Sequence, residues 1–334
     1  MFKKYLFAIV YSVLLTAFTV YVLMDTFVIT RIYSTVPVVE ASSEAGFDGA
    51  DSDTAVTDSD TTVADSYSAV AEAAVNASAS EQTGESPTSQ PPVSTATSYQ
   101  DENITIILTE YREYDTSIYV ADITLSSPEY LQTALAQNAY GRNVTEKTSE
   151  MAVENGAILA INGDYYGSQE KGYVLRNGVL YRDIAERGQE DLVIYEDGSF
   201  EIITEDEVTA QELLDRGAVQ ILSFGPALVT GGDVSVTAGE EVGKARSSNP
   251  RTAIGVIDDL HYVFVVSDGR TDESEGLSLY QLAEFISELG AETAYNLDGG
   301  GSSSMVFNGN VINNPTTSGN RIKERSVSDI VYIG

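Results

Sequence analysis

The chain has 334 residues, with no cysteine, no tryptophan, one histidine and a formal net charge of −33. Without cysteine it has no disulfide and no thiolate metal site, and a single imidazole, His261, excludes a multi-histidine metal site. Because phosphate backbones require a positive protein surface, 51 acidic against 18 basic side chains argue against nucleic acid as a partner.

The first segment, residues 1–35, is predicted to be a cytoplasmic N-terminus followed by a transmembrane signal anchor. Lys3 and Lys4 precede an apolar run from Tyr5 to Met24, and about twenty apolar residues span the hydrocarbon core of a bilayer. No convincing small-x-small cleavage site follows the run, which favours an uncleaved anchor. A cleaved signal peptide is the alternative. Because the lysines flank the amino side, we expect a single-pass cell-membrane protein whose remaining residues are extracellular.

The second segment, residues 36–100, is predicted to be a disordered acidic linker rich in Ser, Thr and Ala. It has eleven acidic residues and no Lys or Arg, so it buries too little apolar surface to offset the entropy of ordering. Mutual repulsion of the acids extends such a chain. We therefore expect a spacer that holds the following domain away from the membrane, with a solvated tail as the plain alternative.

The third segment, residues 101–334, is predicted to form one domain with fifteen basic and thirty-nine acidic residues. Alternating or continuous apolar runs predict strands at 104–108, 118–125, 157–161, 219–223, 253–257, 261–267, 293–297, 304–307 and 327–333. Turn dipeptides predict hairpins at 174–182 and 192–203, and periodic apolar residues predict helices at 129–137, 145–155, 209–216 and 278–289. This mixture predicts an α+β fold: a mixed, largely antiparallel β-sheet with flanking helices.

Polar residues follow apolar strands at four points, and loops at strand ends are where sites usually lie. The four segments are Asn162-Gly163-Asp164-Tyr165-Tyr166, Arg251-Thr252-Ala253-Ile254-Gly255, Asp268-Gly269-Arg270 and Asn296-Leu297-Asp298-Gly299-Gly300-Gly301-Ser302-Ser303-Ser304. Three consecutive glycines let backbone N–H groups form an anion-binding nest, and the serines add donors. No lysine follows them at Walker A spacing, and a tight turn between strands is the plain alternative.

In this order, and followed by Asn313 and Glu324-Arg325-Ser326-Val327, these motifs resemble the phosphodiester glycosidase family of N-acetylglucosamine-1-phosphodiester α-N-acetylglucosaminidase catalytic domains. The resemblance runs from about Ile158 to Ile333 and includes Phe224-Gly225-Pro226-Ala227-Leu228. The added anchor and acidic linker are similar to those of bacterial members described as exopolysaccharide biosynthesis proteins.

The resemblance implies an enzyme that hydrolyses a sugar-1-phosphodiester in envelope or exopolysaccharide glycans and releases a sugar and a phosphomonoester. The expected catalytic carboxylates are Asp298 first and Asp164 second, then Asp268 and Glu324. The expected substrate-binding residues supply arginine forks, amides, backbone donors and a tyrosine ring: Asn162, Gly163, Tyr165, Arg251, Arg270, Asn296, Gly299, Gly300, Gly301, Ser302, Ser303, Asn313 and Arg325.

Several interpretations stay open from the sequence. No cofactor is required for this chemistry, although Asp164, Asp268 and Asp298 are oxygen ligands that a divalent cation such as calcium would accept. The expected partners are a phosphodiester-linked glycan and a lipid bilayer. The alternative functions are a non-catalytic polysaccharide-binding module in exopolysaccharide assembly and a metal-dependent phosphodiesterase, which a single histidine disfavours.

Overall fold

The computed structural model of the chain describes residues 2–35, 91–239, 248–318 and 321–334. Most of the expected acidic linker, residues 36–90, lies outside the described residues. The domain that follows begins earlier than expected, because residues 93–100 form two strands that pair in register with the rest of a sheet, for example Tyr99 with Ile106. The C-terminal boundary of the linker is therefore corrected from residue 100 to the start of these strands.

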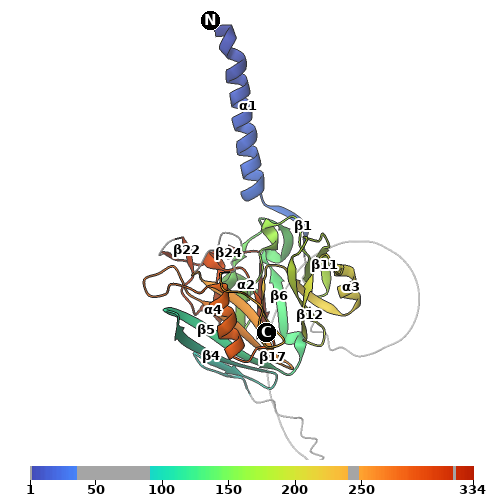
Figure 1. Cartoon of the computed structure of the whole chain (residues 1–334), viewed down its shortest axis with the longest axis vertical. Coiled ribbons are helices and arrows are strands. Elements are labelled where there is room, and N and C mark those ends of the chain that lie inside the picture. The colour runs from blue at the N-terminus through green and yellow to red at the C-terminus, as the bar shows by residue number, and fades with distance from the viewer. Residues whose placement is uncertain (1, 36–90, 240–247, 319–320) are drawn as a thin grey trace, which may run out of the picture. The chain divides into compact units, whose positions relative to one another are not determined.

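The N-terminal helix α1 spans Phe2–Phe27. Its Ile9–Phe27 portion has a mean hydropathy of 1.7 and is long and apolar enough to cross a bilayer, judged by length and composition. Residues 31–35, expected to belong to the anchor segment, instead form strand β1 (Arg31–Thr35), which pairs antiparallel with β7 (Ala139–Arg142) of the domain. The chain directly after the helix is thus part of a domain sheet (Figure 1).

The largest sheet has nine strands, and among the described strands every pair is antiparallel. Its order is β16 (Asp233–Val234), β15 (Ala227–Thr230), β19 (Thr293–Asn296), β17 (Arg251–Asp258), β18 (His261–Ser267), β5 (Thr116–Leu125), β4 (Ile104–Glu113), β3 (Ser98–Gln100) and β2 (Val93–Ser94). Strand β18 is apolar without alternation because side chains from both of its faces are buried.

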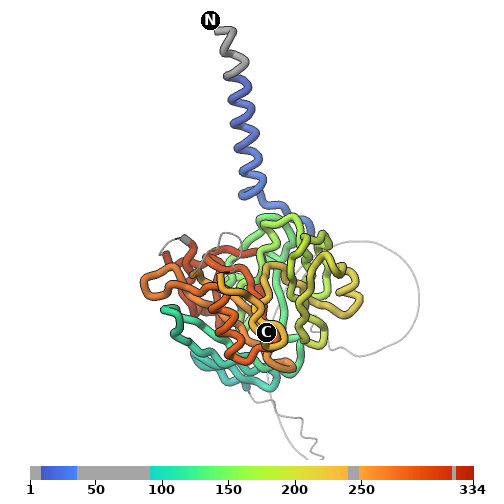
Figure 2. Tube along the Cα trace, in the orientation of Figure 1, coloured from blue at the N-terminus to red at the C-terminus, as the bar shows by residue number. Residues whose placement is uncertain are grey.

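Two five-stranded sheets complete the framework. One has the order β21 (Asn310–Val311), β20 (Met305–Phe307), β9 (Leu159–Asn162), β25 (Asp329–Ile333) and β6 (Leu131–Leu135), and the other β11 (Val179–Arg182), β10 (Val174–Arg176), β14 (Ala218–Leu222), β12 (Glu190–Tyr195) and β13 (Phe200–Thr204). Short pairs are β1–β7, β22 (Thr316–Ser318) with β23 (Arg321–Ile322), and β24 (Ser326–Val327) with β8 (Glu146–Lys147). Figure 2 shows C-terminal residues running beside segments from the first half of the domain.

The main core lies between the nine-stranded sheet and the two smaller sheets. It joins side chains such as Phe264 and Ile123 from the large sheet with Ile161, Val331 and Leu222 from the smaller ones. Each fully buried side chain of this size contributes about 1.5–3 kcal/mol. The outer faces are covered by helices: α4 (Leu279–Glu288) packs on the large sheet, α2 (Thr148–Glu154) on β9 and β25, and α3 (Ala210–Asp215) on β14.

The expected α+β class, with largely antiparallel sheets and flanking helices, is confirmed. One predicted helix is wrong: residues 129–137 form the 3-10 turn η1 (Pro128–Tyr130), strand β6 and the turn η2 (Ala136–Asn138). The strand forms because Leu131, Thr133 and Leu135 are buried beside β25, and that tertiary pairing overrides a helical pattern of only nine residues. The other three predicted helices are present, with α2 starting three residues later than expected.

Candidate active site

Three strands end and two strands begin at one end of the nine-stranded sheet and of the five-stranded sheet that contains β9. In the large sheet, the register places Arg251 beside Ser267 and Ala253 beside Asn296, so the start of β17 lies between the ends of β18 and β19. In the second sheet, Asn162 at the end of β9 pairs with Ile330 near the start of β25. The polar segments expected from the sequence therefore come together here.

Asn162 joins the two sheets. Its side-chain amide donates to the carbonyl of Asp298 at 2.6 Å, and its Oδ1 accepts from the Thr252 hydroxyl at 2.8 Å and from the Ser304 N–H at 3.2 Å. The side chain is fully buried. With these bonds Asn162 fixes the loop that carries Asp298.

Behind this junction lies a buried group of three charged residues. Nη2 of Arg176 is 2.7 Å from Oδ2 of Asp164 and 2.7 Å from Oδ2 of Asp329, and all three side chains are at most 2 % exposed. Asp164 also accepts from the backbone N–H groups of Tyr166 at 2.9 Å and Ser223 at 2.9 Å. Both Asp164 oxygens are thus used inside the protein.

Burial, followed by the negative charge of Asp164, raises the pKa of Asp329 to about 8, against the opposing effect of Arg176. The raised pKa favours the protonated form of Asp329 at neutral pH. Gly163 packs directly on this acid, since a Cβ at residue 163 would lie 2.5 Å from Oδ1 of Asp329. The lack of a side chain at Gly163 thus allows close packing of the β9 loop onto β25.

Asp298 differs from Asp164 and Asp329 because it is only partly buried. Desolvation raises its pKa to about 6, and the negative charge of Asp164 adds to the shift. The Ser302 hydroxyl, the positive charge of Arg325 and the Gly299 N–H act in the opposite direction and favour the carboxylate. A carboxyl group that titrates near neutrality and stays accessible is suited to accept or donate a proton.

The glycine loop follows Asp298 and forms the 3-10 turn η4 (Gly300–Ser302). Its backbone donors were expected to bind an anion, but four of them are used internally. The Gly299 N–H bonds to Asp298, that of Gly300 to the Pro250 carbonyl at 2.8 Å, and those of Ser302 and Ser303 to carbonyls within the turn. The absence of side chains matters instead for close packing: a Cβ on Gly300, whose φ is +64°, would lie 2.7 Å from Nη2 of Arg270, and one on Gly301 3.0 Å from Cα of Thr317.

The three arginines of the expected site differ in access. Arg270 is exposed, lies on the glycine loop, and donates to Oδ1 of Asn249 at 3.0 Å. Arg325 is exposed, and its charge acts on Asp298. Arg251 is 3 % exposed and donates from Nε to the Leu277 carbonyl at 2.9 Å. Arg270 and Arg325 are thus the ones open to a ligand.

Asp268 and Glu324, expected among the catalytic acids, hold segments in place. Asp268 is 3 % exposed and accepts from Asn313, from the backbone and side chain of Asn314, and from the Tyr119 hydroxyl. Glu324 accepts from the backbone and hydroxyl of Ser149 in the first turn of α2 at 2.8 and 2.6 Å. A carboxylate bonded to a helix N-terminus is a common capping arrangement.

Three further expected residues, Asn313, Asn296 and Tyr165, differ in their contacts. Asn313 accepts from the Met305 N–H and donates to the Ser303 carbonyl, so its side chain joins two parts of the loop. Asn296 donates to the Gly225 carbonyl at 2.7 Å, while its Oδ1 and the Ser303 hydroxyl have no partner among the described residues. Tyr165 is 39 % exposed and meets Phe224 edge to face at 5.8 Å, so its ring is available at the surface.

Sequence reasoning missed Arg176 and Asp329. Each was a single charged residue inside an otherwise apolar predicted strand, which is the signal that could have found them. A second missed group lies behind Asp164: the Ser223 hydroxyl donates to Glu205 at 3.1 Å, and burial together with the charge of Glu205 raises the pKa of the fully buried Asp191 well above its ordinary value.

Whether these residues could hold a metal ion depends on how their donor atoms are placed. Within residues 2–35, 91–239, 248–318 and 321–334, no group of three or more His, Asp or Glu side chains is arranged to hold a metal ion. Of the three aspartates considered from the sequence, Asp164 is bonded to Arg176, Asp268 to asparagines and Asp298 to Ser302.

The class of protein is established by a family model described as phosphodiester glycosidase, which matches residues 155–334, more than half of the chain. The chain therefore belongs to the phosphodiester glycosidase family, a class of hydrolases. The family expected from the strand-end motifs is thereby confirmed.

Among curated relatives, the SPbeta prophage-derived uncharacterized protein YomE of Bacillus subtilis (strain 168) is 31 % identical over 52 % of this chain and 28 % of its own length. The N-acetylglucosamine-1-phosphodiester alpha-N-acetylglucosaminidase of Mus musculus is 28 % identical over 50 % of this chain and 35 % of its own length. The chain thus spans about a third of the length of the curated relatives that it matches.

Among solved structures, the zebrafish N-acetylglucosamine-1-phosphodiester alpha-N-acetylglucosaminidase catalytic domain, auto-inhibited by its pro-peptide, matches with a TM-score of 0.55 and 21 % identity. The match covers 69 % of this chain and 82 % of that one. A hypothetical protein from Synechocystis matches with a TM-score of 0.51 and 15 % identity, over 70 % of this chain and 62 % of that one. At these identities both matches establish the fold.

Proposed function

We propose that this protein hydrolyses a sugar-1-phosphodiester at the bond between the anomeric carbon and the phosphate oxygen, releasing a free sugar and a phosphomonoester. The observation that carries the proposal is Asp298, an accessible carboxyl group with a pKa near 6 at the junction of both sheets, beside two exposed arginines. Membership of the phosphodiester glycosidase family supports the same reaction.

Asp298 is the working carboxylate in this mechanism. With a pKa of about 6 it is mostly ionised at neutral pH, and it accepts the proton of the attacking water or stabilises the oxocarbenium-like transition state. The water oxygen bonds to the anomeric carbon as the C–O bond breaks, and the phosphomonoester departs with the bonding electrons. The proton taken from water passes from Asp298 to solvent.

Arg270 and Arg325 hold the phosphate. Guanidinium groups bond phosphate oxygens in a fork and stabilise the charge that grows on the departing group. A phosphomonoester leaves more readily than an alkoxide, so this chemistry depends less on a strong general acid than ordinary glycoside hydrolysis does. Tyr165 supplies an exposed ring for a sugar face.

The buried residues keep Asp298 in place and set its charge. Asn162 holds the Asp298 backbone, and the negative charge of Asp164 raises the pKa of Asp298. Asp164, Asp268, Asn313 and Glu324 are therefore positioning residues in this proposal, since their oxygens and amides are bonded within the protein.

We also propose that the reaction takes place outside the cell on envelope or exopolysaccharide glycans. The support is a helix apolar and long enough to cross a bilayer, with lysines only on its amino side. Proteoliposomes test the orientation: protease added outside should remove the domain when α1 inserts with its N-terminus inside.

The reaction is tested with the full chain in detergent micelles, a panel of sugar-1-phosphodiesters and water labelled with ¹⁸O. We expect phosphorus NMR to show loss of the diester and mass spectrometry to find the label in the released sugar. Label in the phosphate would instead identify a phosphodiesterase, and sugar binding without turnover would identify a binding module. Asp298→Asn, whose fold is checked by circular dichroism, serves as the inactive control.

A further inference from the structure

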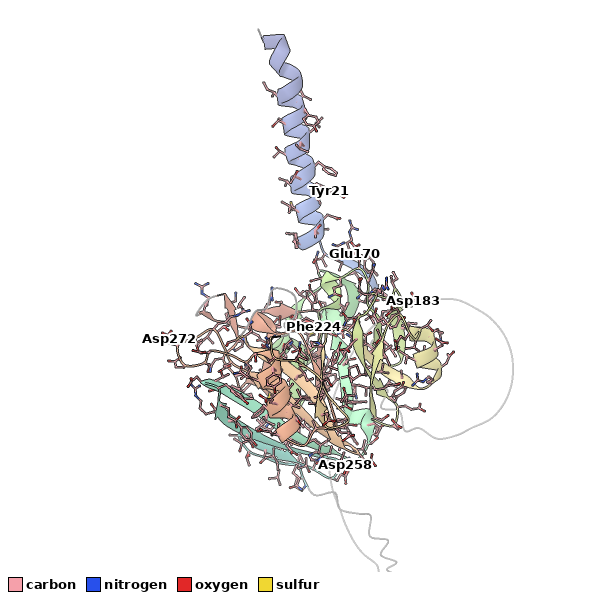
Figure 3. All side chains as sticks on the ribbon, in the orientation of Figure 1. Tyr21, Glu170, Asp183, Phe224, Asp258 and Asp272 are labelled. Carbon is pink, nitrogen blue, oxygen red and sulfur yellow. The ribbon has the colours of Figure 1, made fainter. Side chains whose placement is uncertain are left out.

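The sheet that contains β12 carries a buried acid that the proposed mechanism does not use. Strand β12 lies between β14 and β13. The register with β14 places Asp191 opposite Ser223, the first residue after that strand, and the register with β13 places it diagonally across from Glu205. Side chains at such positions share one face of a sheet and lie close enough to meet. In the view of Figure 3, Phe224, the residue after Ser223, lies toward the middle of the domain, whereas Asp258 lies at its edge.

Asp191 has no hydrogen-bond donor to stabilise a negative charge. It is fully buried, and neither of its carboxyl oxygens accepts a hydrogen bond from a donor among the residues described. The Ser223 hydroxyl donates to Glu205 at 3.1 Å instead. The neighbouring Tyr173 and Tyr295 hydroxyls donate to backbone carbonyls. A carboxylate at Asp191 would therefore be an unpaired buried charge, which costs much more free energy than the neutral acid.

Glu205 is equally buried, but its carboxylate has several donors. Its Oε1 accepts from the Tyr173 N–H at 2.8 Å and from the Ser223 hydroxyl at 3.1 Å, and its Oε2 accepts from the Glu186 N–H. These donors stabilise a carboxylate at Glu205, so Asp191 is the member of the pair that keeps a proton. Burial, followed by the charge of Glu205 and a hydrogen bond between the two acids, raises the pKa of Asp191 well above its ordinary value.

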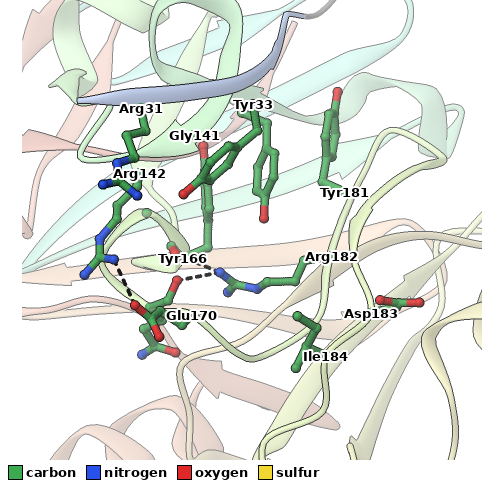
Figure 4. Close-up of a pocket in the computed structure, with 13 residues that line it drawn as sticks. Arg31, Tyr33, Gly141, Arg142, Tyr166, Glu170, Tyr181, Arg182, Asp183 and Ile184 are labelled. Atoms are coloured by element: carbon green, nitrogen blue, oxygen red, sulfur yellow. Dashed lines mark hydrogen bonds and ion pairs between the residues drawn. The ribbon is translucent and has the colours of Figure 1, made fainter. Parts of the chain in front are cut away.

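A buried cation borders the same group. Arg182 is 9 % exposed, and its Nε and Nη1 donate to backbone carbonyls, among them that of Tyr166 (Figure 4). A Cβ on Gly172 would lie 3.4 Å from Oε1 of Glu205 and 3.6 Å from Nη2 of Arg182, so both charged groups lie against this glycine. The attraction between opposite charges favours the ionised form of Glu205 and leaves Asp191 as the neutral member.

Ser223 connects the two acids with the Asp298 site. Its hydroxyl donates to Glu205, while its backbone N–H donates to Oδ2 of Asp164 at 2.9 Å. The negative charge of Asp164 adds to the desolvation that raises the pKa of Asp298. A displacement of Ser223 would therefore alter the surroundings of Asp298 without any contact with substrate.

We propose that Asp191 keeps a proton that it donates to Glu205, and that this acid–carboxylate pair positions Ser223, and through it Asp164, behind Asp298. Without the proton, two buried carboxylates would repel each other beside Ser223. The effect on catalysis rests on the proposed function, whereas the shared proton does not. The titratable and charged groups that face the pair are Asp164 after β9, Tyr173 before β10, Tyr295 on β19 and Arg182 on β11.

The shared proton is tested by denaturant unfolding of the full chain in detergent from about pH 5 to about pH 8, in the wild type and in Asp191→Asn. Folded Asp191 keeps a proton that the unfolded chain loses above the ordinary carboxyl pKa of about 4, so rising pH favours unfolding of the wild type. Asparagine keeps a donor for Glu205 and has no such proton to lose. The ratio of the wild-type unfolding constant to that of Asp191→Asn should therefore rise about tenfold per pH unit until the folded acid ionises.

Asp259→Asn is the matched control for this measurement, because it changes an exposed aspartate in the turn between β17 and β18. Its unfolding constant should keep the same ratio to that of the wild type at every pH. A ratio that is also constant for Asp191→Asn overturns the shared proton.

The positioning role is tested by turnover of the sugar-1-phosphodiester panel. Asp191→Asn should keep kcat and its pH profile within about twofold of the wild type, because the amide still donates to Glu205. Asp191→Ala removes this donor, and Ser223→Ala removes the hydroxyl that Glu205 holds. Both should lower kcat at least about tenfold with little change in KM, since neither alters the exposed arginines.

The outcomes separate the two proposals. Wild-type kcat in both alanine variants overturns the positioning role, and an equal loss in Asp191→Asn and Asp191→Ala overturns the requirement for a neutral donor. A wild-type chain without turnover contradicts the proposed function instead, and the unfolding measurement still decides whether Asp191 carries the proton.

Discussion

The carboxylates at the junction of the two sheets have different partners, and the partners decide what each can do. Asp164 is held by Arg176 and two backbone N–H groups, and Asp268 by asparagines, whereas Asp298 keeps an accessible edge. Desolvation raises the pKa of Asp298 to about 6. In the proposed mechanism, residues with the same side chain therefore separate into one reactive group and several positioning groups.

The pH dependence of catalysis follows from this pKa. Because the raised pKa favours the acid form below about 6 and the proposed mechanism needs the carboxylate, kcat/KM should fall about tenfold per pH unit below that value. A pH–rate profile from 4.5 to 8 measures it, and Asp298→Asn should lose turnover throughout. A flat profile, or a folded Asp298→Asn enzyme with full activity, would remove Asp298 from its role.

Arg325 offers a sharper form of the same measurement. Its positive charge lowers the pKa of Asp298, so Arg325→Gln should move the acidic limb to higher pH. Arg321→Gln changes a second exposed arginine, four residues earlier in the chain, and should leave the limb in place.

Arg176 is expected to be important for stability. Removing it leaves Asp164 and Asp329 buried without their shared cation, and breaking a buried ion pair in this way costs about 3–5 kcal/mol. Denaturant unfolding of Arg176→Met should show this loss. Arg216→Met, which breaks an exposed pair with Glu201, should cost about 0–1 kcal/mol, and equal losses in the two variants would contradict the argument.

At the scale of elements, the glycines of the loop after Asp298 allow neighbouring segments to pack closely against it. Gly300→Ala places a Cβ 2.7 Å from Nη2 of Arg270, and the long side chain moves rather than the fold, so phosphate binding should weaken and KM should rise about tenfold. Gly309→Ala adds a methyl at the similar φ of +74° with nothing within 4 Å. Both variants should lose about 1 kcal/mol of stability from backbone strain, but only Gly300→Ala should change KM, as steady-state kinetics will show.

At the scale of the whole molecule, β1 connects the N-terminal helix to the domain. Strand β1 pairs with β7, and the side chain of Asn143 donates to the carbonyls of Thr26 and Ile29. The residues between the helix and this strand are only those from Val28 to Thr30.

Gly141 permits this pairing, since a Cβ at that position would lie 2.1 Å from the carbonyl oxygen of Arg31. Gly141→Ala should therefore release β1, and hydrogen exchange of residues 31–35 should accelerate at least tenfold relative to the β4–β5 hairpin of the same molecule. Gly156→Ala, whose methyl group faces open space, should not change exchange in β1. Unchanged exchange in Gly141→Ala would show that β1 does not need this contact.

The sequence by itself determined the fold class and the strand ends that carry the polar motifs, because these depend on local turn chemistry and apolar runs. The same motifs carried the resemblance to the family. The Asn177-Gly178 turn and the helix that ends at Gly290 are examples. Only the tertiary structure decided that Asp298 is the accessible acid, that residues 131–135 form a strand, and that Arg182 is a buried cation. The reason is distance along the chain: Arg176 and Asp329 are 153 residues apart, and Asn162 and Asp298 are 136 apart. Burial and partners between such segments exist only after the sheets pack, so no local pattern predicts them.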